Sequence, residues 1–314
     1  MGLATRTLGR TGIKVTDVGM GCWAIGGASF RDGIPSGWSG TDIGQSLEAV
    51  RSAWDAGVTL FDTADAYGRG KSEVLLGMAL HEHKPNAVVA TKVGNSLAGP
   101  GQNFTEPYIR GCLDASLTRL EMSRVDLYQL HGPPVEAMTE ELFDLMRALK
   151  DEGKVGAWGV SIGSIEEGER AIEGGAEIIQ LVYNILQPDV GNAIYPLAEA
   201  KDVGIIVRVP LASGWLTGKY DENTVFPNED HRSRRFGPEQ VRQMANRVKL
   251  LDFLLEEADS LAEAAIRFTL MPSVVSTVIP GAKSPAQVAA NVKASGRPLS
   301  DGAMQRIADV VAEF

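Results

Sequence analysis

Short apolar runs alternate along the chain with longer segments in which apolar residues recur every three or four positions. The short runs predict buried parallel strands, and the longer segments predict amphipathic helices. Leu47, Val50 and Trp54, for example, share one face of a helix predicted over residues 41–56. Residues 5–17 precede the first such unit and alternate around two glycines, which predicts a β-hairpin.

The predicted strands cover residues 18–23, 58–61, 87–93, 125–130, 157–162, 178–183, 205–209 and 274–279. The predicted helices cover residues 41–56, 72–80, 106–120, 139–150, 193–201, 238–257, 260–269 and 301–312, with two more that begin after Ser164 and Ser284. Each of these two serines is followed three residues later by Glu or Gln, which is typical of a capping box.

Eight strand-then-helix units therefore follow one another without a linker or a change of composition. The simplest arrangement is an α/β fold, a (β/α)8 TIM barrel that spans residues 1–314 as one domain, with an N-terminal β-hairpin and an extra C-terminal helix. An open, doubly wound sheet is the alternative. The strands of a barrel end on one face, where the functional site lies. Six polar residues fall at or near these strand ends: Asp62, Lys92, His131, Ser161, Gln180 and Arg208.

The composition supports a packed core, because 44% of the residues are hydrophobic, and the net charge of −10 argues against a nucleic-acid binder. No apolar run has the length of a membrane span or the form of a signal peptide, so no membrane association is expected. Cys22 and Cys112 are expected to be free thiols, as in a reducing compartment. The expected location is the cytoplasm.

Two nucleotide-binding motifs are incomplete. Residues 19–24 match a dinucleotide-binding fingerprint, but a segment rich in Gly, Ser and Pro follows where that fingerprint requires a helix. Gly70, Lys71 and Ser72 resemble the end of a P-loop, yet Asp65 occupies the position of its first glycine. No HExxH or CxxC pattern is present, so no metal site is expected.

Four residues form a plausible site for proton transfer to a carbonyl group. An ammonium beside a phenol stabilises the phenolate, so Lys92 is expected to lower the pKa of Tyr67. Asp62 would hold Lys92 charged and oriented, and His131 would donate a hydrogen bond to the carbonyl oxygen. Tyr67 would be the general acid in reduction and, as phenolate, the base in oxidation. Taken singly, each residue has an ordinary structural explanation; together at successive strand ends they favour catalysis.

The segments that carry these residues, FDTADAYGRGKSE, ATKVG and LYQLH, resemble those of the aldo-keto reductase superfamily, and IPGAKSPAQVAAN adds an independent match. The resemblance covers essentially the whole chain, and the PLASG segment is similar to that of bacterial reductases and potassium-channel β-subunits. It implies NADPH-dependent reduction of aldehydes, ketones or sugars to alcohols, or the reverse oxidation, without a metal. Gly132 follows His131 where the family often has a bulky aromatic residue, so the resemblance does not define the substrate wall at this position.

The resemblance also implies how the cofactor NADP(H) would bind across the barrel mouth. Ser161 and Gln180 would hold the nicotinamide carboxamide, although Ile162 stands where the family often has Asn. Arg208 would stack on the nicotinamide, or else pair with a neighbouring acid. The complete expected cofactor set is Gly21, Cys22, Trp23, Asp62, Ser161, Gln180, Arg208, Val209, Pro210, Leu211, Ala212, Gly214, Leu216, Gly218, Lys219, Ile279, Gly281, Lys283, Gln287 and Asn291.

Lys283, beside a capped helix N-terminus, is expected to bind the adenosine 2′-phosphate. Gln287 and Asn291 lie four apart and would face the adenine, although Gln287 is equally explained as a capping-box residue. Because Lys283 is expected to bind the 2′-phosphate, NADPH is expected over NADH. The chain departs from the family at two nearby positions, with Gln at 287 where the family often has Arg and Ala at 290 where it often has Glu.

Two other functions remain open. The chain could be a regulatory, β-subunit-like sensor that binds NADPH, or an aldose dehydrogenase that works in the oxidising direction. Residues 24–40 and 220–237 are the variable loops that could close over the cofactor as a lid. The basic run at residues 231–235 is interpreted more simply as surface. The oligomeric state and the identity of the small carbonyl substrate are left open.

Overall fold

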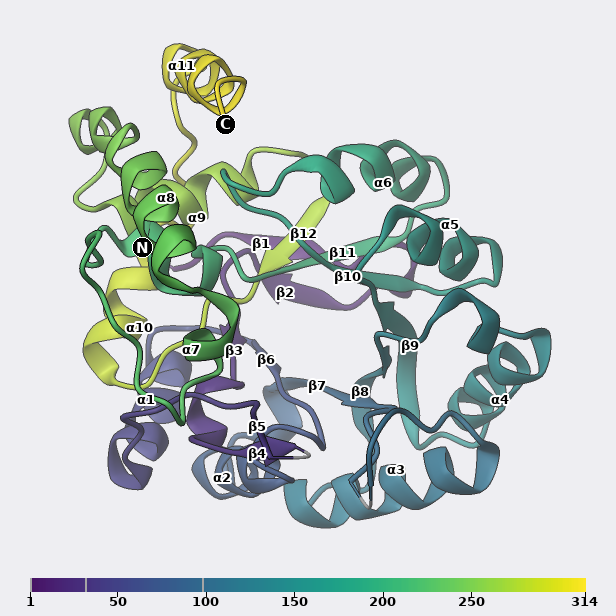
Figure 1. Ribbon diagram of the computed structural model, residues 1–314. Helices are drawn as coiled ribbons and strands as arrows, with labels where there is room; N and C mark the ends of the chain where they lie inside the picture. Colours follow the sequence, from purple (N-terminus) through teal and green to yellow (C-terminus); the bar gives the residue numbers. More distant parts are fainter. Residues whose placement is uncertain (1, 32, 98) are drawn as a thin grey trace.

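The barrel is closed. The computed structural model describes residues 2–31, 33–97 and 99–314. Eight parallel strands are hydrogen-bonded in the order β12-β11-β10-β9-β8-β7-β6-β3, and bridges from Val18 to Val278 and from Gly21 to Gly281 join the two edges. Helices surround the strands (Figure 1), which confirms the predicted (β/α)8 barrel and excludes the open sheet.

The barrel strands are β3 (Met20–Gly21), β6 (Leu60–Asp62), β7 (Val88–Val93), β8 (Val125–His131), β9 (Val155–Ser161), β10 (Ile178–Val182), β11 (Gly204–Arg208) and β12 (Val275–Val278). The α-helices are α1 (Ile43–Asp55), α2 (Lys71–Ala79), α3 (Glu106–Leu120), α4 (Glu140–Asp151), α5 (Ile165–Glu173), α6 (Asp189–Ala200), α7 (His231–Arg235), α8 (Pro238–Lys249), α9 (Leu261–Leu270), α10 (Pro285–Val292) and α11 (Asp301–Val311). Each predicted strand is present, and so is each predicted helix except the last part of the one over residues 238–257; the other bounds differ by a few residues.

Three details differ from the prediction. Helix α7 and a second hairpin, β4 (Phe30–Arg31) with β5 (Ile34–Pro35), lie in segments expected to be loops. The segment predicted as one helix over residues 238–257 is α8 followed by a separate 3-10 helix, Asp252–Glu256. Both predicted loops therefore contain short ordered elements, and β5 contacts α7.

The predicted N-terminal hairpin, β1 (Thr5–Thr7) paired with β2 (Lys14–Thr16), closes the end of the barrel opposite the strand C-termini. Leu8 and Val15 from this hairpin pack against an apolar layer inside the barrel. The layer takes its side chains from neighbouring strands: Leu60, Ala90, Leu127, Ala157, Ile178, Ile206 and Ile279. The barrel interior is therefore dry at this end, and polar side chains are confined to the other.

The serine caps of α5 and α10 are present in a modified form. Ser164 accepts a hydrogen bond from the backbone of Glu167, and the Glu167 carboxylate in turn accepts one of 2.6 Å from the backbone of Gly163. Helix α10 repeats this arrangement with Ser284 and Gln287. In a capping box the side chain of Glu167 or Gln287 would bond to the backbone of the cap residue itself. Here each bonds instead to the residue before the cap, and both Glu167 and Gln287 line the barrel mouth.

Cys22 and Cys112 are free, as predicted. None of the helices in the described ranges combines the length and apolar character that crossing a membrane requires.

Candidate active site

The polar layer at the barrel mouth follows from strand geometry. Side chains two residues apart on a strand point to the same face. The residue two positions after each apolar residue of the interior layer therefore also points inward, nearer the carboxyl end of the strand. Leu60 precedes Asp62 in this way, and Ala90 precedes Lys92. The other inward positions continue the layer with Gln129, His131, Ser161, Gln180 and Arg208.

Lys92, Asp62 and Tyr67 form a connected polar group. Lys92 Nζ lies 2.5 Å from Asp62 Oδ1, donates to the backbone oxygen of Thr63 at 2.8 Å, and lies 3.2 Å from the Tyr67 hydroxyl. Lys92 has no exposed surface, and Asp62 is 2% exposed. A buried ammonium with three oxygen partners has its hydrogen-bonding capacity filled, so its position relative to the phenol is fixed.

The pKa values of this group differ from the simple expectation in one respect. Burial raises the pKa of Tyr67, and Lys92 opposes that shift only in part, so the net direction is upward. Burial lowers the pKa of Lys92, but Asp62 and Tyr67 together raise it by more than burial lowers it. The net shift in the pKa of Lys92 is therefore also upward. The lysine is therefore charged and the phenol protonated near neutral pH, which suits a proton donor.

His131 packs against Tyr67 with ring centroids 5.7 Å apart and planes at 85°. Burial lowers the pKa of His131 well below its usual value, and the nearby cations Lys92, Arg208 and Arg31 act in the same direction. Its Nδ1 is buried and has no hydrogen-bond partner among the described residues. A neutral imidazole has one N–H to donate, which is the form needed to hold a carbonyl oxygen.

A cavity of about 550 Å³ opens above these residues. The predicted residues that line it are Gly21, Trp23, Asp62, Tyr67, His131, Ser161, Gln180, Arg208, Val209, Pro210, Leu211, Gly214, Lys219, Ile279, Gly281, Lys283, Gln287 and Asn291. Lys92 lies behind Tyr67 and Asp62 and reaches the cavity only through them. The sequence-based set thus converges on one concave site.

Four predicted cofactor residues do not line that cavity. The side chains of Cys22, Ala212 and Leu216 are buried in the core beneath the barrel mouth, and Gly218 is exposed beyond its edge. Cys22 follows Gly21 on the chain, and successive side chains of a strand face opposite sides. With Gly21 at the cavity, Cys22 must point away from it.

Ser161 and Gln180 bond to the protein itself. Gln180 donates to Asp62 Oδ2 at 2.7 Å and to Gln129 at 3.2 Å, while its oxygen accepts from Ser161 at 3.4 Å. Gln129 also donates to Asp62 Oδ2, at 3.1 Å. Gln180 therefore has a structural role in addition to facing the cavity.

Gln129 belongs to this site and was missed from the sequence. It is fully buried and bonds to both Asp62 and Gln180. The signal for it was present, because Gln129 lies two residues before His131 on the same strand and so on the same face. Trp38, Glu167, Tyr220 and Arg232 also line the cavity and were not predicted as site residues.

The loop after strand β11 has an uncommon backbone. Val209, Ala212 and Ser213 have φ angles of 57°, 47° and 58°, in the left-handed region that non-glycine residues rarely adopt. Asn184 Nδ2 donates a hydrogen bond of 3.0 Å to the backbone oxygen of Val209 and supports this conformation. Such strain is concentrated at functional sites, and here it brings loop backbone to the cavity wall.

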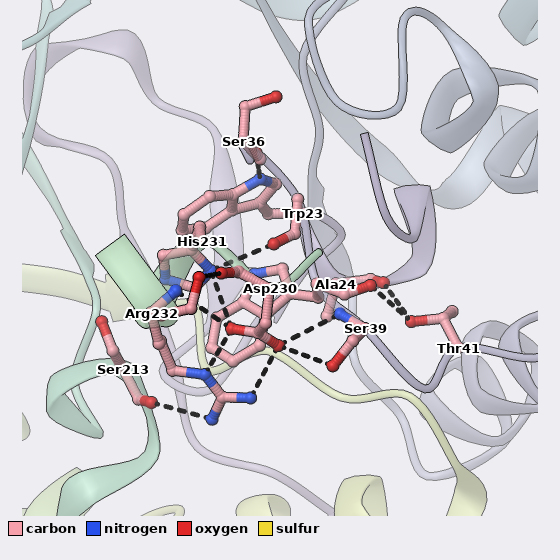
Figure 2. A network of polar contacts seen from close by, with 12 residues as sticks. Trp23, Ala24, Ser36, Ser39, Thr41, Ser213, Asp230, His231 and Arg232 are labelled. Atoms are coloured by element: carbon pink, nitrogen blue, oxygen red, sulfur yellow. Dashed lines mark hydrogen bonds and ion pairs between the residues drawn. The ribbon is translucent and has the colours of Figure 1, made fainter. Parts of the chain in front are cut away.

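Two loops far apart in the sequence meet over the cavity (Figure 2). The Asp230 carboxylate accepts from the backbone and hydroxyl of Ser39 at 3.1 and 2.9 Å and pairs with Arg232 at 2.7 Å. The ring of His231 lies 4.5 Å, centroid to centroid, from each of Trp23 and Trp38. The interpretation of residues 231–235 as plain surface is therefore wrong for His231 and Arg232, which are buried against the other loop.

Arg208 ends strand β11 and faces the cavity. Its Nη2 donates to the backbone oxygen of Ile162 at 3.0 Å, and its Nε is buried without a hydrogen-bond partner among the described residues. Burial lowers the pKa of Arg208. Within the described ranges no carboxylate lies close enough to form an ion pair with it, so the expected alternative of a salt bridge is not formed.

The opposite end of the cavity carries three cations. Lys283 Nζ donates to the backbone oxygen of Ser39 at 2.9 Å. Burial lowers the pKa of Lys283, and the charges of Arg232 and Lys219 act in the same direction. Gln287 uses its side-chain oxygen to cap the helix, by accepting from the backbone of Lys283 at 2.8 Å. Asp230 already pairs with Arg232 and opposes the shift in the pKa of Lys283, so Lys219 and Lys283 are the cations of this group that can attract a further anion.

Comparison with known proteins agrees with this geometry. The family described as "Aldo/keto reductase family" matches residues 17–312. The aldo-keto reductase YhdN of Bacillus subtilis is 32% identical over 303 residues, covering 92% of this chain and 88% of the relative. A Schizosaccharomyces pombe protein named "Putative voltage-gated potassium channel subunit beta" is 31% identical, covering 92% of this chain and 87% of the relative.

Among solved structures, the glycerol dehydrogenase AKR11B4 from Gluconobacter oxydans superposes with a TM-score of 0.84 at 28% identity, covering 98% of this chain and 95% of that one. The chain therefore belongs to the aldo-keto reductase family, an oxidoreductase family. Its relatives include both bacterial reductases and proteins named as potassium-channel β-subunits, as the sequence segments indicated. Membership of the family implies use of a nicotinamide cofactor and a small carbonyl substrate.

Proposed function

We propose that this protein is an NADPH-dependent reductase that converts aldehydes or ketones to alcohols, with Tyr67 as the general acid. The observation that carries the proposal is the Tyr67 hydroxyl held 3.2 Å from a buried, charged Lys92 at the edge of a 550 Å³ cavity. A protonated phenol beside a fixed ammonium can release its proton to a developing alkoxide, because the ammonium stabilises the phenolate that remains.

The residues of the cavity fit an NADP(H) molecule. Lys219 and Lys283 offer cations for its phosphates, whereas Arg232 is already paired with Asp230. Residues of the strained loop from Val209 line the same cavity. Lys283, at the N-terminal side of capped helix α10, is the residue proposed for the 2′-phosphate. Arg208 lies at the other end, where its planar guanidinium could cover the nicotinamide face.

An NADPH held by these residues would supply a hydride for the carbonyl carbon. His131 donates a hydrogen bond to the carbonyl oxygen, which orients the substrate and withdraws charge from its carbon. Tyr67 transfers its proton to that oxygen as the alcohol forms. Lys92 stabilises the phenolate, and Asp62, fixed by Gln129 and Gln180, holds Lys92 in place.

The oxidising direction is the second candidate, because one structural neighbour is named a glycerol dehydrogenase. It requires the same four residues, with the Tyr67 phenolate as base. A regulatory sensor is supported by the relatives named as channel subunits. That function predicts tight NADPH binding with very slow turnover, whereas a reductase predicts turnover in the ordinary range of about 1–1,000 per second.

The test is steady-state turnover with NADPH and a panel of aldehydes, ketones and aldoses, and with NADP+ and the matching alcohols. Replacing Tyr67 with Phe removes only the acidic proton. We expect the Tyr67→Phe variant to lose about 100- to 10,000-fold in reduction, with NADPH affinity within about threefold of the wild type. Unchanged turnover in the variant would refute the acid role, and no turnover by the wild type in either direction would favour the sensor.

A further inference from the structure

Arg208 is a cation inside the cavity without a carboxylate partner among the described residues. Its one hydrogen-bond acceptor among the described residues is the backbone oxygen of Ile162, at 3.0 Å from Nη2. Its Nε is shielded from solvent and unpaired. A guanidinium carries five N–H donors, and a shielded charge that lacks a counter-ion destabilises the protein unless a ligand supplies one.

The carboxylates that line the cavity with it are already engaged. Asp62 accepts from Lys92, Gln129 and Gln180, and so has donors on both of its oxygens. Glu167 accepts from the backbone of Gly163 at 2.6 Å and serves the cap of α5. Neither comes close enough to Arg208 for an ion pair within the described ranges. Asp62 and Glu167 act on the charge of Arg208 from a distance, but no acid among the described residues forms an ion pair with it.

Arg208 is also separate from the other cations of the cavity. Lys219 and Arg232 act on the charge of Lys283 at one end. Arg208 instead acts on the groups proposed to carry out the chemistry, because it favours ionised Tyr67 and neutral His131. Lys219 and Lys283 are therefore available to a dinucleotide, since Asp230 already pairs with Arg232, while Arg208 is beside the groups proposed to carry out the chemistry.

The wall beside Arg208 leaves room for a substituent. Gly132 lines the cavity, and a Cβ built on it would meet nothing closer than 3.8 Å. The neighbouring strand ends contribute Ser161 and Ile162, which are also part of the lining. Position 132 therefore contributes no side chain to the cavity that His131 and Arg208 also line.

We propose that Arg208 binds a negatively charged group of the substrate, so that this enzyme prefers carbonyl compounds that carry a carboxylate or a phosphate. This proposal rests on the reductase function proposed above and names its substrate class. A guanidinium binds carboxylates and phosphates through the N–H groups on its edge, often in pairs. Its flat face stays free, so binding an anion is compatible with covering a nicotinamide ring.

The experiment compares two pairs of substrates, each with one anionic and one neutral member that carry the same aldehyde group. Succinic semialdehyde and its methyl ester test a carboxylate, and glyceraldehyde 3-phosphate and glyceraldehyde test a phosphate. We expect kcat/KM for the better anionic substrate to exceed that of its neutral partner by about 10- to 100-fold. In Arg208→Leu the ratio should fall to about one, and Arg208→Lys should keep part of it, because a point charge lacks the paired donors.

The ratio removes effects that both substrates share, including any change in cofactor binding. Lys283→Ala is the matched control, because it removes a cation from the far end of the same cavity and should leave the ratio unchanged. A wild-type ratio near one for both pairs, or a ratio that survives in Arg208→Leu, would overturn the proposal while leaving the reductase function intact.

A second readout does not depend on turnover. Calorimetric titration of succinate, which cannot be reduced, into wild-type protein saturated with NADPH should show binding, and the same titration into Arg208→Leu should show none. If none of the four aldehydes is reduced, no ratio can be measured, and this titration alone decides whether Arg208 binds an anion. The same titration with inorganic phosphate tests the phosphate case. If neither succinate nor inorganic phosphate binds to the wild type, the anion site is rejected.

Discussion

Gln180 Nε2 lies 2.7 Å from Asp62 Oδ2 and donates a hydrogen bond to it from strand β10 to strand β6, which lie on opposite sides of the barrel. Gln129 donates to the same oxygen at 3.1 Å, and Lys92 binds the other oxygen at 2.5 Å. Both oxygens of this carboxylate are therefore held. The position of Lys92, and through it the environment of Tyr67, depends on an amide from the far side of the barrel.

Replacing Gln180 with Met keeps the size of the side chain and removes its polar atoms. Asp62 Oδ2 would then retain Gln129 alone, and Ser161 would lose its acceptor. We expect the free energy of unfolding to fall by about 1–3 kcal/mol, the cost of leaving buried polar groups unpaired. Carbonyl reduction should fall as well, because Lys92 is less well positioned.

Urea unfolding measures the first effect and steady-state turnover the second. Gln305→Met is the control, since Gln305 lies on exposed α11 and bonds only to Asp309 among the described residues. That substitution should change stability by less than about 0.5 kcal/mol. Equal effects of the two substitutions would show that the Gln180–Asp62 contact has no special importance.

Lys92→Met should be among the more destabilising single substitutions in this chain. It leaves the buried carboxylate of Asp62 without its ammonium, and removing one partner of a buried pair costs about 3–5 kcal/mol. The double variant Asp62→Asn, Lys92→Met removes both charges and should regain part of that loss. Denaturant unfolding of the wild type, both single variants and the double variant measures the coupling, and strict additivity would contradict a direct ion pair.

The fold could be predicted largely because its strands and helices follow from local patterns. Leu47, Val50 and Trp54 recur at helical spacing on what is α1, and uniformly apolar runs became the parallel strands. Helix α7 and the β4–β5 hairpin were missed because distant contacts stabilise them. Asp230 caps α7 and binds Ser39, which lies 191 residues earlier in the chain.

The candidate site was predictable where strand ends determine position. Asp62, Lys92 and His131 meet because all strands of a barrel end on one face. The upward shift in the pKa of Tyr67 could not be predicted. The sequence shows the charge of Lys92, which lowers this pKa, but it does not show the depth of burial of Tyr67, which raises it by more. Burial depends on how segments such as the one bearing Trp23, whose ring stacks on Tyr67, fold over the mouth.

Replacing Lys283 with Ala should weaken the binding of NADPH by about tenfold or more and that of NADH by less than about twofold, because a charge-assisted hydrogen bond to the 2′-phosphate would be lost. Fluorescence titration of both cofactors gives the two affinities. Lys293→Ala is the control, since Lys293 lies just after the same helix and pairs, among the residues that the structure describes, with exposed Asp259 alone. Equal weakening of NADPH and NADH would place the 2′-phosphate elsewhere.

Asp65 makes stability depend on pH. It lies in the loop between Asp62 and Tyr67, has no exposed surface, and neither of its oxygens has a hydrogen-bond partner among the described residues. Burial, followed by the nearby carboxylate of Glu73, raises the pKa of Asp65 from 3.8 to about 7, with Arg119 opposing the shift. The folded protein therefore holds this proton more tightly than the unfolded chain does.

A carboxyl group whose pKa is raised by folding contributes its full stability below the unfolded pKa of 3.8 and loses it as the pH rises toward about 7. Asp65→Asn is neutral at every pH and avoids that loss. We expect this variant to match the wild type near pH 4 and to be more stable by about 2–4 kcal/mol at pH 8. Urea unfolding at pH 4, 6 and 8 tests the trend, with Asp55→Asn on the exposed end of α1 as a control that should show no such rise. A constant difference across this range would mean that Asp65 does not titrate as its burial requires.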